Sequence, residues 1–146
     1  MAAGARYRIG EVAAETDVST RTLRYYEELG LLTPSGHSPG GARRYSDDDV
    51  ARVRRIRELQ ELVGFNLEEI RTIVAAEDRL GELRQEFRAG RSPERERQII
   101  TEAIEINDRL RTEMRNKLAR LETFLADLDA KATLYRRRAR AQRSGR

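Results

Sequence analysis

Cationic and aromatic side chains gather within residues 19–45 at a spacing suited to an anionic polymer. Residues three and four apart are neighbours on a helix, so Arg21, Arg24, Tyr25 and Glu28 are expected to share one face. Guanidinium groups bind phosphates through charge and hydrogen bonds, and a tyrosine hydroxyl adds a further donor. One face of this helix is therefore suited to a nucleic-acid backbone, while another face packs inward.

A second short helix is expected before this one. Apolar residues follow helical spacing from Ile9, and Asp17 interrupts the pattern about two turns later. Ser19 or Thr20 can cap the next helix, which ends near Gly30. Two short helices joined by a tight turn form a helix-turn-helix, whose second helix lies in the major groove of DNA. A small helical hairpin without this role is the alternative.

A loop and a short strand follow the helix-turn-helix. Residues 35–41 are rich in glycine, serine and proline, and residues 42–45 return as a strand, which predicts a hairpin wing. Successive side chains of a strand point to opposite sides, so Arg43 and Tyr45 share a face and Arg44 takes the other. At least one arginine is then expected to face solvent or DNA. For both arginines, a solvated loop is the alternative.

Two further helices complete the amino-terminal half. Ser46, with the three aspartates behind it, starts a third helix, which ends at Gly64. Asn66 with Glu69 forms a capping box that opens a fourth. Residues 77–92 are expected to form a separate short connector helix and a loop.

A long helix is predicted over residues 93–135, about 65 Å at 1.5 Å per residue. Its residues repeat at steps of four and three, which defines a heptad seam of Ile100, Ile104, Asn107, Arg111, Met114, Leu118, Leu121, Leu125, Leu128, Ala132 and Tyr135.

The amino-terminal residues are too few to cover such a seam, so a partner helix is expected. A second copy of the chain, paired parallel or antiparallel, is the economical partner. The expected dimer contacts are all seam residues except Arg111, Ala132 and Tyr135. Asn107 would fix the register by demanding a polar partner, and the alternative is a polar residue at a frayed edge of the seam.

Composition agrees with long exposed helices, because 37% of the residues are charged and 38% are apolar. The net charge of +4 is a weaker signal than it looks. Residues 136–146 contain six arginines and no acid, so the first 135 residues carry a net charge of −2. We expect residues 136–146 to be a disordered basic tail with non-specific attraction to DNA.

Several classes of function are disfavoured. The chain has no cysteine and only His37, which argues against a disulfide framework and a metal site, and no cofactor is expected. No apolar run is long enough for a membrane span and no signal-peptide core is visible, so a cytoplasmic location is expected. An enzyme is the weakest class, because no phosphate-cradling loop and no credible acid cluster is present.

Five short stretches between residues 9 and 70 occur in a distinctive order and spacing: Ile9-Gly10-Glu11-Val12-Ala13, Thr22-Leu23-Arg24-Tyr25-Tyr26-Glu27, Gly30-Leu31-Leu32, Gly41-Ala42-Arg43-Arg44-Tyr45-Ser46 and Gly64-Phe65-Asn66-Leu67-Glu68-Glu69-Ile70. In these stretches, and in the long helix that follows, the chain resembles the MerR-type transcriptional regulators of bacteria.

Taken with the residue patterns above, the resemblance implies a mainly α fold with four parts. These are a winged helix-turn-helix head with a small β-hairpin over residues 1–76, a connector over 77–92, a dimerising antiparallel coiled coil over 93–135 and the basic tail over 136–146. Members of the family bind palindromic promoter DNA as homodimers. Many activate by distorting the promoter so that RNA polymerase can engage it, and others repress.

The resemblance also implies which residues meet DNA. Arg21, Arg24, Tyr25 and Arg43 would contact it, mainly at phosphates, and Tyr26 lies at the same surface in the family. Near the start of the recognition helix, Thr20 and Arg21 are the candidates for base contacts. Ala42 replaces a tyrosine that the family usually has in the wing, so a phosphate contact there is either lost or moved to Arg44. The metal-sensing branch of the family is disfavoured because its cysteines are missing.

A protein-binding module is the alternative within this family: a similar head and coiled coil that modulates a chaperone or another regulator without binding DNA. The cationic face formed by Arg21, Arg24, Tyr25 and Arg43 argues against it, because such a module has little need of one.

Overall fold

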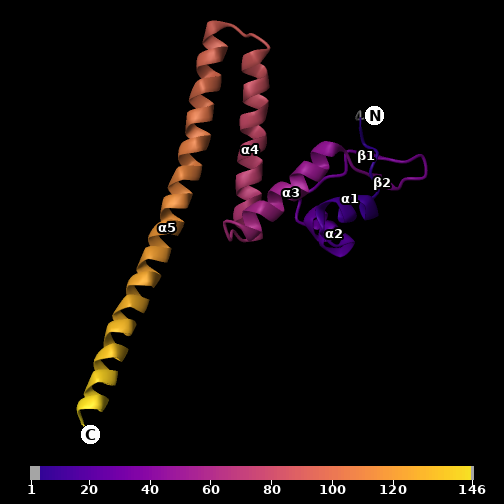
Figure 1. Ribbon diagram of the computed structural model, residues 1–146. Helices are drawn as coiled ribbons and strands as arrows, with labels where there is room; N and C mark the ends of the chain where they lie inside the picture. The colour runs from indigo at the N-terminus through magenta and orange to yellow at the C-terminus, as the bar shows by residue number, and fades with distance from the viewer. Residues whose placement is uncertain (1–3, 146) are drawn as a thin grey trace. The chain divides into compact units, whose positions relative to one another are not determined.

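The computed structural model describes residues 4–145, and its contacts divide the chain into two compact units, Met1–Gly81 and Glu82–Arg146. Figure 1 shows a mainly helical chain with one short hairpin, as the sequence predicts. The elements are α1 (Ile9–Thr16), α2 (Thr20–Glu28), β1 (Gly36–His37), β2 (Arg43–Arg44), α3 (Asp47–Glu61), α4 (Leu67–Arg88) and α5 (Pro93–Ser144).

The helix-turn-helix is formed by α1 and α2. Asp17 ends α1 in the left-handed conformation, with φ of 55°, and this makes the tight turn between the helices. The Oγ atom of Ser19 accepts the Thr22 N–H at 3.1 Å, so the cap of α2 is Ser19 rather than Thr20. Val12 and Leu23 are fully buried and bring the two helices to a common core.

The wing is an antiparallel hairpin in which His37 pairs with Arg43 and Gly36 with Arg44. Its tip is closed by the Ser38 N–H, which donates to the Ala42 carbonyl at 2.7 Å. Each strand has only two residues, shorter than the strand expected over residues 42–45. Beyond β2, Tyr45 and Tyr7 exchange two backbone hydrogen bonds of 2.9 Å, which ties the start of the chain to the wing.

The third and fourth helices begin at the predicted caps. The Asp49 N–H donates to Ser46 Oγ at 3.2 Å, and the Ser46 N–H returns a bond to Asp49 Oδ2 at 2.9 Å. At α4, the Glu69 N–H donates to Asn66 Oδ1 at 2.8 Å, and the Asn66 N–H donates to Glu69 Oε1 at 3.1 Å. The buried face of α3 consists of Val50, Val53, Ile56 and Leu59.

The separate connector helix expected over residues 77–92 is wrong, because α4 continues without a break to Arg88. One interior glycine, Gly81, costs a helix only about 1 kcal/mol relative to alanine. Leu83 lies two residues later and is 99% buried, so packing of the apolar face favours continuing the helix.

The long helix α5 starts at the predicted cap and first turn. Ser92 Oγ accepts the Arg95 N–H at 3.2 Å, and Pro93 occupies the first turn. Arg95 also forms a two-pronged ion pair with Glu86 near the end of α4, with both N–O distances 2.9 Å. Buried Ile99 extends the packing of this unit.

The disordered tail expected over residues 136–146 is also wrong, because α5 runs to Ser144. Arginine is a good helix former, and cations near a helix carboxyl end interact favourably with its dipole. A helix already nucleated upstream therefore propagates through the arginines. Arg146 lies outside the described residues.

The seam is an exposed apolar stripe along α5. Its large apolar side chains, Ile100, Ile104, Leu118, Leu121, Leu125 and Leu128, are each between 45% and 56% exposed. Met114 is half-buried and Asn107 is exposed. Ile99 and Ile106, in contrast, are buried and do not belong to the seam. Within residues 4–145, no helix combines the length and the apolar character required to cross a bilayer.

Candidate nucleic-acid interface

The recognition helix α2 has the two faces that its sequence predicts. Leu23 is buried on the inner side, whereas Arg21, Arg24 and Tyr25 are exposed, with Tyr25 at 48%. Within the described residues, neither Arg21 nor Arg24 forms an ion pair with a carboxylate, so both guanidinium groups are available to an external anion. Thr20, in the first turn of the helix, is half-buried.

Tyr26 does not lie on that surface, which corrects the expectation taken from the family. It is only 3% exposed, and its hydroxyl donates to Gln60 Oε1 of α3 at 3.4 Å. Burial raises the pKa of Tyr26. Its position follows from helical geometry, since Tyr26 lies three residues after Leu23 on the same inward face.

The wing is tied to α2 through one carboxylate, Glu27. Arg43 Nε lies 3.1 Å from Glu27 Oε2, and the Tyr45 hydroxyl donates a hydrogen bond to Glu27 Oε1. Arg43 and Tyr45 therefore share a face of the strand, as alternation predicts. Burial, and then the bond to Glu27, raise the pKa of Tyr45 far above its ordinary value, so its hydroxyl remains a donor.

A cationic groove of about 430 Å³ lies beside α2 and the wing. Its lining includes no acid, and four of its six residues are arginines: Arg8, Ile9, Arg24, Ala42, Arg43 and Arg44. Three elements contribute, namely the start of α1, the outer face of α2 and the wing. Guanidinium groups brought together in this way form a binding site for phosphate oxygens. We call this site the arginine groove.

Sequence reasoning missed Arg8. It stands immediately before α1 and looks like part of a basic lead-in, but the fold brings it to the same groove as Arg24, Arg43 and Arg44. A basic side chain at the position before a helix was the only local signal. Its proximity to the wing depends on the backbone pairing of Tyr7 with Tyr45, which the local sequence does not indicate.

The arginines of α3 have structural partners instead. Arg57 donates to the Thr16 carbonyl at 2.6 Å and so provides a hydrogen-bond partner for a free carbonyl at the end of α1. Arg55 pairs with Glu77 at 2.6 Å, and Arg52 pairs with Asp78. These contacts join α3 to its neighbours. Arg24 and Arg43, by contrast, both line the arginine groove.

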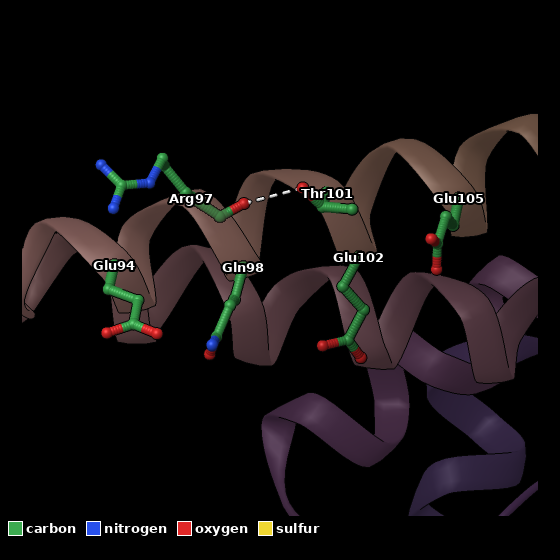
Figure 2. A pocket seen from close by; sticks show the side chains of 6 residues that line it. All are labelled: Glu94, Arg97, Gln98, Thr101, Glu102 and Glu105. Carbon is green, nitrogen blue, oxygen red and sulfur yellow. Dashed lines mark hydrogen bonds between the residues drawn. The ribbon is translucent and has the colours of Figure 1, made fainter.

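A larger hollow, of about 620 Å³, is a poor site for a polyanion. Figure 2 shows that its side chains all come from α5, where the Thr101 hydroxyl donates to the Arg97 carbonyl at 2.9 Å. The lining residues are Glu94, Arg97, Gln98, Thr101, Glu102 and Glu105, with three carboxylates against one guanidinium. The larger hollow is therefore not the candidate site for a polyanion, because its lining carries more negative than positive charge.

A tight two-helix turn, a hairpin wing and a cationic outer face together define a winged helix-turn-helix protein. Residues 7–77 match the family described as "MerR HTH family regulatory protein". Residues 7–77 therefore form a domain of the MerR HTH type.

Named relatives agree with this assignment. The chain is 40% identical over 106 residues to the nodulation protein NolA of Bradyrhizobium sp. strain NC92, covering 73% of this chain and 42% of NolA. It is 44% identical over 68 residues to the HTH-type transcriptional activator TipA of Streptomyces coelicolor, covering 47% of this chain and 26% of TipA. The chain thus spans less than half the length of these relatives.

A solved structure supports the fold over a longer stretch. A putative MerR family transcriptional regulator from Listeria monocytogenes has 24% sequence identity and a TM-score of 0.52, and the match covers 88% of this chain and 85% of that one. At this identity the likeness concerns the fold alone.

Proposed function

We propose that this protein is a homodimeric transcriptional regulator that binds a palindromic promoter site, with α2 of each subunit in a major groove. The observation that carries the proposal is the arginine groove, which lies beside the outward face of the recognition helix of a MerR-family domain. Its guanidinium groups bind the DNA backbone and set the register of α2. Thr20 and Arg21, in the first turn of α2, contact base edges.

Phosphate contacts come from both sides of the groove. Arg24 and Tyr25 approach the backbone from α2, and Arg43 and Arg44 approach it from the wing, with Arg8 joining them from the start of α1. Each neutralised phosphate releases counterions, so operator affinity falls steeply as salt increases.

The exposed seam supports dimer formation. A row of leucines about half exposed along one helix is costly unless another helix covers it, and heptad spacing is the pattern that a coiled-coil partner covers. We propose an antiparallel pair of α5 helices, which holds two heads at a fixed separation. The half-sites then lie about one DNA turn or a small multiple apart.

Promoter distortion completes the proposal. A rigid dimer that grips two half-sites can bend or untwist the DNA between them, and the energy of that deformation depends on the spacer sequence. The distorted promoter is then presented to RNA polymerase. Because promoter DNA is the partner, the protein acts in the bacterial cytoplasm.

A mobility-shift titration on DNA upstream of the gene tests the proposal. Arg24→Ala combined with Arg43→Ala should abolish operator binding at moderate salt and leave the dimer intact. The control is Arg84→Ala with Arg109→Ala, which removes the same charge from exposed positions outside the groove and the seam. Arg8→Ala alone should lower the slope of log affinity against log salt by about 2, because the dimer loses one phosphate contact in each head.

Full operator binding by the double groove variant would refute the assigned surface. A wild-type dimer that binds none of the upstream DNA would favour the protein-binding module instead.

A further inference from the structure

The last turns of α5 carry a charge that the winged head does not use. Residues 136–144 contain five arginines and no acid, every one of these residues is exposed, and the segment is helical. We call it the arginine segment. Arg143 lies in the last turn, where a cation stabilises the helix dipole, but that effect fades within one turn. Helix stability therefore does not account for the arginines upstream of it.

The helix arranges three of these arginines in a row. Arg136, Arg140 and Arg143 are separated by steps of four and three, so they project from one face. At 1.5 Å per residue the row spans about 10 Å of helix axis. Successive phosphates of one DNA strand advance by about 3.4 Å, so a row of this length faces roughly three of them.

The composition of the segment argues against other anionic partners. Its other side chains are two alanines, a glutamine and a serine, so it has no large apolar residue to enter a membrane interface. The seam ends at Tyr135, so the segment also lacks apolar knobs for packing against another helix. Duplex DNA requires neither feature, because its backbone is bound by charge and hydrogen bonds alone.

We infer that the arginine segment is a second DNA-binding site, which contacts phosphates outside the two half-sites without reading sequence. The inference rests on the proposed function for one point: a head bound to its operator raises the concentration of DNA near the segment. Weak contacts then add to affinity through that tether. The segment should lengthen the bound footprint without changing which operator is chosen.

The test compares full-length wild type with the triple variant Arg136→Gln, Arg140→Gln and Arg143→Gln. Glutamine is also a good helix former, and circular dichroism checks that α5 is retained. Binding is measured by fluorescence anisotropy on an operator trimmed to its half-sites, on the same operator with flanks of about two helical turns, and on an unrelated duplex. The control variant is Arg84→Gln, Arg109→Gln and Arg120→Gln, with the same charge change at exposed positions.

Wild type and control should bind the flanked operator about tenfold more tightly than the trimmed one, and the triple variant should bind both equally. With flanks, the salt slope of the triple variant should be smaller by up to about 5, because each of the two segments in the dimer loses as many as three phosphate contacts. Equal flank dependence in wild type and the triple variant would overturn the inference. The inference would also be overturned if the triple variant bound all three duplexes as tightly as wild type does but lost affinity for vesicles of phosphatidylcholine and phosphatidylglycerol.

The unrelated duplex separates this inference from the proposed function. If wild type shows no operator preference but loses affinity for the unrelated duplex in the triple variant, the proposed regulator is wrong and the arginine segment still binds DNA. If operator preference is intact and the unrelated duplex is bound equally by both, the regulator stands and the segment does not bind DNA.

Discussion

The Nε atom of Arg43 lies 3.1 Å from Oε2 of Glu27, so a wing residue and a recognition-helix residue share an ion pair. The Glu27 side chain is only 11% exposed, and its other oxygen accepts the Tyr45 hydroxyl. Arg43 is 52% exposed and also lines the arginine groove. Glu27 thus holds a cation in place at the surface where we propose that phosphate binds.

The first prediction concerns Glu27 as a positioning residue. Glu27→Gln keeps an acceptor for Tyr45 but removes the charge that holds Arg43, so operator affinity should fall about fivefold, equivalent to roughly 1 kcal/mol. In an Arg43→Ala background the same change should alter affinity less than about twofold, since the group that Glu27 positions is gone. The measurement is a double-mutant cycle on operator binding.

Glu28→Gln is the matched control, because Glu28 is an exposed neighbour on α2. Removing its negative charge near DNA should leave operator affinity unchanged or raise it. An equal loss from Glu27→Gln in both backgrounds would mean that Glu27 stabilises the fold without positioning Arg43.

The second prediction concerns stability. Tyr45 is fully buried, and Tyr45→Phe leaves the part-buried Glu27 carboxylate without one of its two donors. The free energy of unfolding in urea at pH 7 should fall by about 1–3 kcal/mol. Tyr7→Phe is the control, since the Tyr7 hydroxyl also donates to a carboxylate, Asp47, at 2.9 Å, but at an exposed site. Its cost should stay below about 0.5 kcal/mol.

The third prediction follows from the raised pKa of Tyr45. Burial and the Glu27 hydrogen bond favour the protonated hydroxyl in the folded state, whereas the unfolded chain ionises near pH 10. A folded pKa above the unfolded value gives stability that is complete below about pH 10 and is lost as pH rises further. The stability advantage of wild type over Tyr45→Phe should therefore shrink from about pH 9.5 to about pH 11.5, the range in which tyrosine ionises in the unfolded chain.

Urea titrations across that window measure the advantage directly. A gap between wild type and Tyr45→Phe that stays constant with pH would contradict the assignment. Tyr26, whose pKa burial also raises, remains in both proteins, so its titration contributes to both curves and leaves their difference to Tyr45.

The local elements of this fold were predictable because their signals are local. Ser19, Ser46, Asn66 and Ser92 each cap a helix, as a small polar side chain before a helical pattern indicates. The outward face of the recognition helix was predictable for the same reason, because the helical period of 3.6 residues places the adjacent Leu23 and Arg24 on different faces.

The arginine groove was only partly predictable, because it is assembled from residues far apart in the sequence. Arg24 and Arg43 were found through local pattern and family resemblance, whereas Arg8 reaches the groove through tertiary pairing. The burial of Tyr26 shows the opposite failure. Helical spacing alone turns it inward beside Leu23, and the family resemblance wrongly placed it at the DNA surface.

The two errors in helix length have one physical cause. The sequence suggested breaks before Glu77 and after Tyr135, but helix formation is cooperative, so a helix with packed residues on either side continues through weak positions. A single glycine or a run of arginines lacks the strong stop signal that Gly90 with Pro93 provides between α4 and α5.

The fourth prediction concerns the seam. Leu121→Asp with Leu125→Asp places two carboxylates in the expected coiled-coil core, where desolvation of unpaired charges is costly. The molar mass from sedimentation equilibrium should fall from two chains to one. Operator binding should then weaken by a factor of more than about 100, because each head binds its half-site without the other.

Asn116→Asp with Ala119→Asp is the matched control, because it adds the same two charges to exposed positions on the opposite side of α5. This variant should remain a dimer and bind the operator within about threefold of wild type, since its charges stay in water. A seam variant that keeps the mass of two chains would place the dimer contacts elsewhere. If the seam variant were monomeric yet kept full operator affinity, one head would suffice, and the fixed separation of two heads would not be the basis of DNA binding.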